Sequence, residues 1–300
     1  MKHAIGLIAV LVLAILAVPV LAEIENKTAT TLSWREANRI AVARYQEAVQ
    51  KYQNAVDRYQ IARQQFIAMR ERVGSFRQAN ETPELINKTK VFLSNAVNKG
   101  INNLELVKKW IDKINISEEK KEELISTIDI HISNLEGLMD DIEAIETKED
   151  AIAISKQIRA EWTSARVAVK KAVGLAMVHR TDFVINRLEV LADKLQQRID
   201  SLKAEGKETA QMQDLLDNFN DHLETAKEKY ELAKQKFSEI SDVGDANKLF
   251  AEGRQFLREA HQQLKEAHAK LVEIVKEGRA QNVSVETEIS QTAEEVGGEA

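Results

Sequence analysis

Residues 41–73 read AVARYQEAVQKYQNAVDRYQIARQQFIAMRERV, and this stretch decides the fold class. Its apolar positions follow alternating steps of four and three residues, with small and aromatic side chains taking turns: Ala41, Tyr45, Ala48, Tyr52, Ala55, Tyr59, Ala62, Phe66, Met69 and Val73. Such spacing keeps one stripe of an α-helix facing a neighbouring helix. The stretch therefore predicts a coiled-coil helix, which we place at residues 33–80.

The same kind of stripe recurs near the C-terminus. In residues 208–240 it consists of Met212, Leu216, Phe219, Leu223, Ala226, Tyr230, Ala233, Phe237 and Ile240. After a predicted tight turn at residues 242–245 it continues through Ala246, Phe250, Gly253, Leu257, Ala260, Leu264, Ala267, Leu271 and Ile274. Two matched stripes joined by a short turn predict an antiparallel helical hairpin.

Breaks divide the rest of the chain into further helices. Thr82-Pro83 is a typical helix start, with a capping hydroxyl followed by proline at the first helical position. Residues 115–117 break the chain again. Thr147 and Asp150 predict the cap of another helix, which meets no breaker before Gly206. Six helices result.

A weak internal repeat suggests how the helices are grouped. INNLE at residues 101–105 resembles INRLE at residues 185–189. The predicted fold is all-α, with six long amphipathic helices, heptad packing and elongated tandem three-helix bundles that share one long helix. This is similar to tandem spectrin-type repeats in architecture only, since no signature residue of that family occurs. The predicted segments are a signal peptide (1–22), a linker (23–32), the N-terminal coiled-coil helix (33–80), a first bundle (81–175), a second bundle (176–278) and a disordered polar tail (279–300).

Composition supports long helices and excludes several classes of site. Charged residues make up 30% of the 300, with 11 glycines and only 2 prolines, which suits helices better than sheets. The absence of cysteine excludes disulfides, thiolate nucleophiles and cysteine-based metal sites. The net charge is -6 and no basic block with aromatic residues occurs, so we expect no nucleic-acid partner.

The first 22 residues resemble an export signal. A positive start is followed by an apolar run, Ala4–Val18, and by small residues at Val20 and Ala22. This order predicts a secretory signal peptide cleaved after Ala22, and hence a secreted or cell-surface protein. Retention of Ala4–Ala22 as an uncleaved membrane anchor is the alternative, because a span needs about 20 apolar residues.

Five Asn-x-Ser/Thr triplets agree with an exported chain. They are candidate N-glycosylation sites at Asn26, Asn80, Asn87, Asn115 and Asn282. A structural explanation competes with this one, because Thr82 and Ser117 are also candidate helix N-caps.

The sequence contains none of the common motifs of catalytic or metal-binding sites. No histidine has a carboxylate three residues before it, which the di-iron helical bundles require. Phosphate loops, zinc-protease helices and nucleophile elbows are absent too. His131 lies at a predicted core position, where we expect a hydrogen-bonded structural role. We therefore predict no catalytic, cofactor-binding or metal residues, no cofactor and no enzyme.

The aromatic seam, defined as Tyr45, Tyr52, Tyr59 and Phe66, is the candidate interaction site. It either docks a partner or packs inside the protein's own core, and we favour the core. Two three-helix units leave its helix without an assigned neighbour, so this helix packs as a fourth member of the first bundle or pairs with another molecule.

Two functions fit these features. The first is a non-enzymatic, exported coiled-coil scaffold at the cell surface or secreted, with a protein partner or self-association through helical seams. The alternative is a soluble extracytoplasmic bundle that binds a ligand between helices. A membrane partner applies only if the N-terminal segment is retained.

Overall fold

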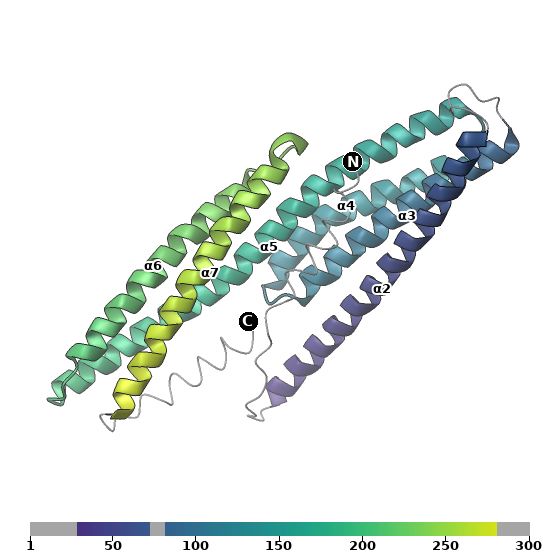
Figure 1. Cartoon of the computed structure of the whole chain (residues 1–300). Coiled ribbons are helices and arrows are strands. Elements are labelled where there is room, and N and C mark those ends of the chain that lie inside the picture. The colour runs from purple at the N-terminus through teal and green to yellow at the C-terminus, as the bar shows by residue number, and fades with distance from the viewer. Residues whose placement is uncertain (1–28, 73–81, 281–300) are drawn as a thin grey trace. The chain divides into compact units, whose positions relative to one another are not determined.

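The computed structural model describes residues 29–72 and 82–280, and these residues form helices and short connections without a strand (Figure 1). The helices are α2 (Ala29–Arg72), α3 (Pro83–Lys113), α4 (Glu118–Glu143), α5 (Lys148–Ala204), α6 (Ala210–Ser238) and α7 (Val243–Ala280). The prediction of an all-α fold with six long helices is confirmed.

The starts of α3 and α5 follow from their caps. Thr82 has extended backbone angles, and its hydroxyl accepts a hydrogen bond from the Leu85 N–H at 3.2 Å, with Pro83 at the first helical position. At α5 the Thr147 N–H donates to Asp150 Oδ2 at 2.9 Å, and the Asp150 N–H donates to Thr147 Oγ1 at 3.2 Å. Both caps satisfy N–H groups that a helix start leaves without partners.

The end of α5 follows from Gly206. This glycine has φ +77°, a left-handed conformation that only glycine adopts at little cost. Its N–H bonds to the Lys203 carbonyl at 3.1 Å, and the Lys207 N–H bonds to the Leu202 carbonyl at 3.0 Å. This pair of bonds is the Schellman motif, which ends the helix where the sequence predicts.

Three details differ from the sequence-based expectations. The helix α2 already begins at Ala29, inside the predicted linker. Ser117 stands at the N-cap of α4 but makes no side-chain capping bond. The turn before α7 ends at Asp242 rather than spanning 242–245, because the Asp242 carboxylate accepts from the Gly244 N–H at 2.6 Å and starts the helix at Val243.

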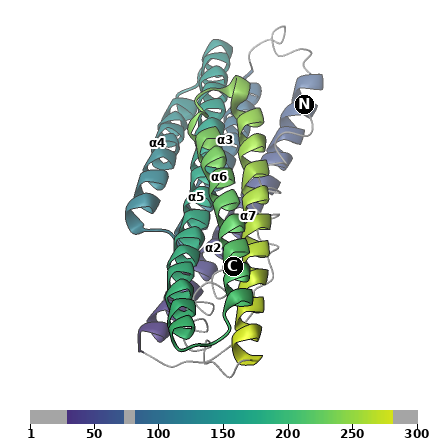
Figure 2. The ribbon, with the colours of Figure 1, turned by 90° about the vertical axis from the view of Figure 1, so that its left-hand side faces the viewer.

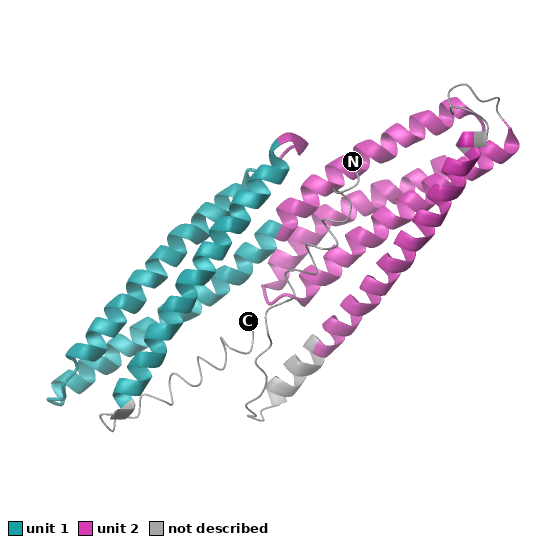
Figure 3. Cartoon of the chain, in the orientation of Figure 1, with its two compact units in different colours: residues 1–26, 174–240, 245–300 teal, residues 27–173, 241–244 magenta. Residues whose placement is uncertain are grey.

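The chain divides into two compact units (Figure 3). The described residues of unit 2 are 29–72, 82–173 and 241–244, and those of unit 1 are 174–240 and 245–280. Unit 2 thus holds α2, α3, α4 and the first part of α5. Unit 1 holds the remainder of α5 with α6 and nearly all of α7.

In unit 2, α3 is the central helix, since it packs against both α2 and α4. An ion pair and a hydrogen bond connect α3 with α4. Lys108 Nζ of α3 lies 2.5 Å from Asp129 of α4, and Lys90 Nζ of α3 donates to the Glu143 carbonyl of α4. A Cβ on Gly100 of α3 would lie 2.7 Å from Nε1 of Trp162, so the glycine gives the indole its place against α3.

In unit 1, α6 and α7 run side by side along α5 residues 174–204 (Figures 1 and 2). The Phe237 ring of α6 is fully buried between two glycines: a Cβ on Gly174 of α5 would lie 2.2 Å from the ring, and one on Gly253 of α7 would lie 2.7 Å away. Phe250 packs on the same ring, with centroids 5.6 Å apart. The two glycines and the ring hold the three helices at close distance.

Candidate interaction site

The aromatic seam of α2 faces α3 within unit 2. Tyr45 and Tyr52 are buried, with 5% and 8% of their surface exposed, while Tyr59 and Phe66 are half-buried. Between them the small residues Ala48, Ala55 and Ala62 are also buried, which lets the two helix backbones approach closely.

The seam pairs with α3 in one antiparallel register. The Phe66 ring stacks on Phe92, with centroids 4.9 Å apart and planes 9° apart. One heptad earlier on α2, the Tyr59 ring lies under Lys99 Nζ at 4.5 Å, and Lys99 is one heptad later on α3. Each heptad along α2 is thus matched by a heptad in the opposite direction along α3.

The next two steps follow the same rule. The register places Leu106, which is 4% exposed, opposite Tyr52. It then places Lys113 opposite Tyr45, and Lys113 Nζ indeed lies 5.4 Å from the Tyr45 ring centroid. Three contacts, Phe66 with Phe92, Tyr59 with Lys99 and Tyr45 with Lys113, therefore share one alignment, which identifies α2 and α3 as an antiparallel coiled-coil pair.

Lysines over tyrosine rings give this seam its particular electrostatics. Lys99 is only 7% exposed, and burial lowers the pKa of its ammonium group. A cation over an aromatic face is attracted by about 0.5–2 kcal/mol, which offsets part of the cost of removing the ammonium from water. Burial also raises the pKa of Tyr45 and of Tyr52, so both remain neutral phenols.

The Tyr45 hydroxyl is a weak point of the seam. It is buried, and no described residue provides it with a hydrogen-bond partner. Burying a hydroxyl without a partner costs about 1–3 kcal/mol. The buried tyrosine of α6, Tyr230, differs: it hydrogen-bonds Asp182 of α5, and burial together with this carboxylate raises its pKa.

Three residues of α3 that complete the seam were not found from the sequence: Phe92, Lys99 and Leu106. The most buried face of α3 includes Leu93, Val97 and Leu104, and the three missed residues lie beside it in the sequence. Their heptad spacing of seven residues was a usable signal, but a lysine in this series argued against a buried face.

His131 of α4 pairs with a carboxylate of α5. Its Nδ1 lies 2.5 Å from Glu161 Oε1 of α5, and the other oxygen of Glu161 accepts from Asn134 Nδ2 at 3.3 Å. A metal ion needs at least three suitable ligands to be held by protein alone. No group of three or more such residues comes together in the part of the chain that the structure describes.

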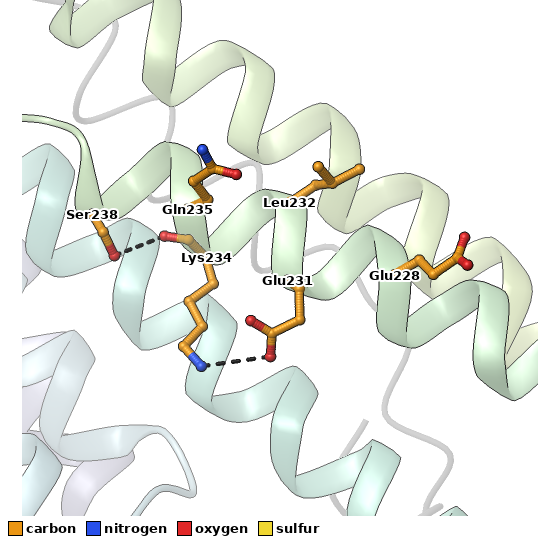
Figure 4. A pocket seen from close by; sticks show the side chains of 6 residues that line it. All are labelled: Glu228, Glu231, Leu232, Lys234, Gln235 and Ser238. Atoms are coloured by element: carbon orange, nitrogen blue, oxygen red, sulfur yellow. Dashed lines mark hydrogen bonds and ion pairs between the residues drawn. The ribbon is translucent and has the colours of Figure 1, made fainter.

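Two surface hollows of the described residues lie on α6 and between α2 and α3. One of them is lined by six residues of α6 alone (Figure 4): Glu228, Glu231, Leu232, Lys234, Gln235 and Ser238. Two of these side chains form an ion pair within the helix, since Lys234 Nζ lies 3.5 Å from Glu231. The Ser238 hydroxyl donates a hydrogen bond to the Lys234 carbonyl of the same helix. A second hollow, between α2 and α3, is lined by Arg44, Glu47, Ala48, Lys51, Asn102, Glu105 and Lys109.

Two candidate glycosylation residues lie in the described residues. Asn87 is exposed on α3, and Asn115 is exposed in the connection between α3 and α4. The cleavage residue Ala22 and the acceptors Asn26, Asn80 and Asn282 lie outside the described residues. Within residues 29–72 and 82–280, no helix has a stretch long and apolar enough to span a bilayer.

The chain was also compared with known proteins. The family models, the curated proteins and the solved structures to which the chain was compared each gave no match.

Proposed function

We propose that this chain is an exported, non-enzymatic coiled-coil protein that acts as a structural or interaction scaffold, at the cell surface or secreted. The observation that supports it best is the register between α2 and α3. Four heptads of aromatic and small residues serve helix-to-helix packing, and α6 and α7 repeat the arrangement around Phe237. Side chains committed to such seams build a stiff support rather than a reaction centre.

The described surface favours a scaffold over a ligand-binding bundle. A small-molecule site is normally a concave, mostly apolar pocket with a few converging polar groups. The hollow on α6 has its charges paired along one helix, and the hollow between α2 and α3 contains an ion pair of α2, Lys51 with Glu47 at 2.7 Å. All six residues around the α6 hollow come from one helix, so they do not converge on it from several elements.

Export is supported by the first 22 residues. Their positive start, apolar run and small residues before Glu23 match a cleavable signal. A scaffold outside the cell would work through a protein partner or a second copy, by further helix-to-helix contact. The chain has no cysteine, so outside the cell it would be stabilised without disulfides. Helix caps and the packing of helices against one another are consistent with this.

Cell fractionation with N-terminal sequencing tests the proposal. The chain is produced with a C-terminal epitope tag, beside the Ala22→Arg variant, in which the cleavage site is blocked. We expect the tag outside the cytoplasm and a new N-terminus at Glu23, with the variant left at full length. A tagged chain that remains in the cytoplasm with Met1 intact contradicts export. An uncleaved wild-type chain in the membrane fraction identifies the anchored alternative.

Crosslinking on intact cells then tests the scaffold role. We expect one or a few protein partners, or a second copy, attached to the exposed faces of the helices. Tight binding of a small molecule by the purified chain, with no protein crosslinked, contradicts the scaffold and favours the ligand-binding bundle.

A further inference from the structure

Two Asn-x-Ser/Thr triplets of the described chain have opposite geometries. Asn115, Ile116 and Ser117 lie in the connection between α3 and α4, while Asn87, Lys88 and Thr89 lie inside α3. We propose that Asn115 is an N-glycosylation acceptor that remains usable after the chain has folded, and that Asn87 is not. In the cell this rests on the proposed function, because the glycosylating enzymes act outside the cytoplasm.

The backbone turns at the first triplet and leaves both of its polar side chains exposed. The Ile116 N–H donates to the Ile114 carbonyl at 3.1 Å, which makes a tight turn with Asn115 at its centre. Ile114 and Ile116 are buried, with 9% of their surface exposed, whereas Asn115 and Ser117 are exposed. The amide and the hydroxyl that the transferase must recognise together are thus both accessible outside a helix.

The helix separates the same groups in the second triplet. Residues two apart on an α-helix lie on nearly opposite faces. Asn87 is exposed, but Thr89 is 3% exposed, and its hydroxyl donates to the Leu85 carbonyl at 2.8 Å. An enzyme that reads both side chains must first unwind this part of α3, which breaks the Thr89 bond and exposes buried surface.

The capping explanation accounts for one hydroxyl and not for the other. Thr82 is occupied as the N-cap of α3 through its bond to the Leu85 N–H. Ser117 stands at the equivalent place before α4 and makes no capping bond with its side chain. The hydroxyl of the Asn115 triplet is therefore not used as a helix cap.

The reaction needs a lipid-linked sugar as the second substrate. The Asn115 amide nitrogen forms a bond to the anomeric carbon of the first sugar, and the bond from this carbon to the lipid phosphate oxygen breaks. The lipid phosphate leaves with the electron pair of that bond. The amide nitrogen loses one proton, so atoms and charge balance without an oxidant or a reductant.

Glycosylation in vitro tests this difference without depending on export. The purified full chain, folded, is treated with a single-subunit oligosaccharyltransferase and a short lipid-linked oligosaccharide, and each site is read by peptide mass spectrometry. Synthetic peptides 83–91 and 111–119 serve as unfolded controls. We expect both peptides to be modified, and in the folded chain we expect Asn115 to react at least about 100-fold faster than Asn87, because only the latter requires local unfolding.

Two variants complete the experiment. Ser117→Ala removes the recognised hydroxyl and is expected to abolish modification at Asn115 with no change in helix content, while Ser117→Thr retains it. Equal rates at Asn87 and Asn115 in the folded chain would overturn the proposal, as would an Asn115 that stays unmodified there or in its peptide. Since the enzyme is supplied, these outcomes hold even if the chain is found in the cytoplasm, which would overturn only the proposed function.

Discussion

The helix α2 in unit 2 and the helix α6 in unit 1 both carry an alternation of small and aromatic residues, but the two seams differ in how far their rings are buried. In α6 the large residues Phe219 and Phe237 are 0% exposed, and Tyr230 has a hydrogen-bond partner. In α2 the corresponding residues Tyr59 and Phe66 are only half-buried. We call the α6 seam sealed, because its large rings are fully buried, and the α2 seam open, because two of its four rings are partly exposed.

The difference comes from what faces each seam. Phe237 sits between Gly174 and Gly253, so that two neighbouring helices touch its ring from opposite sides. Phe66 stacks on another half-buried ring, Phe92. Tyr59 contacts the same Phe92 ring, with centroids 5.8 Å apart, and the ammonium of Lys99. Similar heptad patterns can therefore produce seams that are buried to different extents, depending on the residues that face them.

Truncating one ring in each seam should give the largest contrast. We expect Phe237→Ala to lower the stability of unit 1 by about 3–5 kcal/mol, because a fully buried ring leaves a cavity. Phe66→Ala should cost unit 2 only about 1–2 kcal/mol, since this ring is only partly buried. Hydrogen exchange read separately for each unit measures both, because two units need not unfold together. Equal losses would contradict the distinction between a sealed and an open seam.

Replacing each of two glycines by alanine should change the stability of the protein in opposite directions. Gly253→Ala forces a Cβ to within 2.7 Å of the Phe237 ring, and we expect a loss of about 1–3 kcal/mol. Gly137 of α4 has no atom within 4 Å of the position of an added Cβ, so Gly137→Ala should gain about 0.5–1 kcal/mol from helix propensity. Thermal unfolding with hydrogen exchange distinguishes them. A neutral Gly253→Ala would show that the ring is not held by the glycines.

Removing a hydroxyl from each seam should also have opposite signs. Tyr230→Phe deletes a bond to the Asp182 carboxylate, and we expect a loss of about 1–2 kcal/mol in unit 1. Tyr45→Phe deletes a buried hydroxyl that no described residue satisfies, and unit 2 should gain about 1 kcal/mol. Urea unfolding of the two variants, followed per unit, is the measurement. A loss from Tyr45→Phe would reveal a partner for this hydroxyl.

The smallest expected effect is at Lys99. Burial lowers the pKa of this lysine from its usual 10.5, so folding disfavours the ammonium form. The penalty is fully present below the folded pKa and disappears as pH rises from that value to 10.5. Lys99→Met should therefore gain up to about 1 kcal/mol near neutral pH, less the attraction of the Tyr59 ring, and the gain should shrink at alkaline pH. Lys113→Met, at a half-buried position, is the control and should give no gain.

Much of the fold could be predicted from local signals. Thr82-Pro83, the Thr147 and Asp150 box and Gly206 set helix ends that the structure reproduces, because each satisfies the backbone of a helix terminus by itself. The apolar stripes also predicted the buried residues of α6. Ser117 stands at the predicted N-cap position, but its hydroxyl makes no capping bond. The residue type allows such a bond, whereas the side-chain rotamer decides whether it forms.

The pairing of α2 with α3 could not be predicted in the same way. A heptad pattern is nearly unchanged when one helix slides by seven residues along another, so the stripe alone leaves several registers equivalent. What selects one is the flanking side chains, namely Phe92 against Phe66 and Lys99 over Tyr59. These contacts depend on tertiary geometry, and Lys99 in particular has a side chain that sequence patterns assign to solvent.

The pairing of the aromatic seam with α3 of the same chain can be tested most directly with cysteines, since the chain has none of its own. Tyr52→Cys is combined with Leu106→Cys, which the register places opposite, and in a control chain with Lys99→Cys, which lies one heptad away. After mild oxidation and electrophoresis without reductant, the account predicts a disulfide within one chain for the first pair and little for the second. Crosslinked dimers, or equal crosslinking of both pairs, would contradict it.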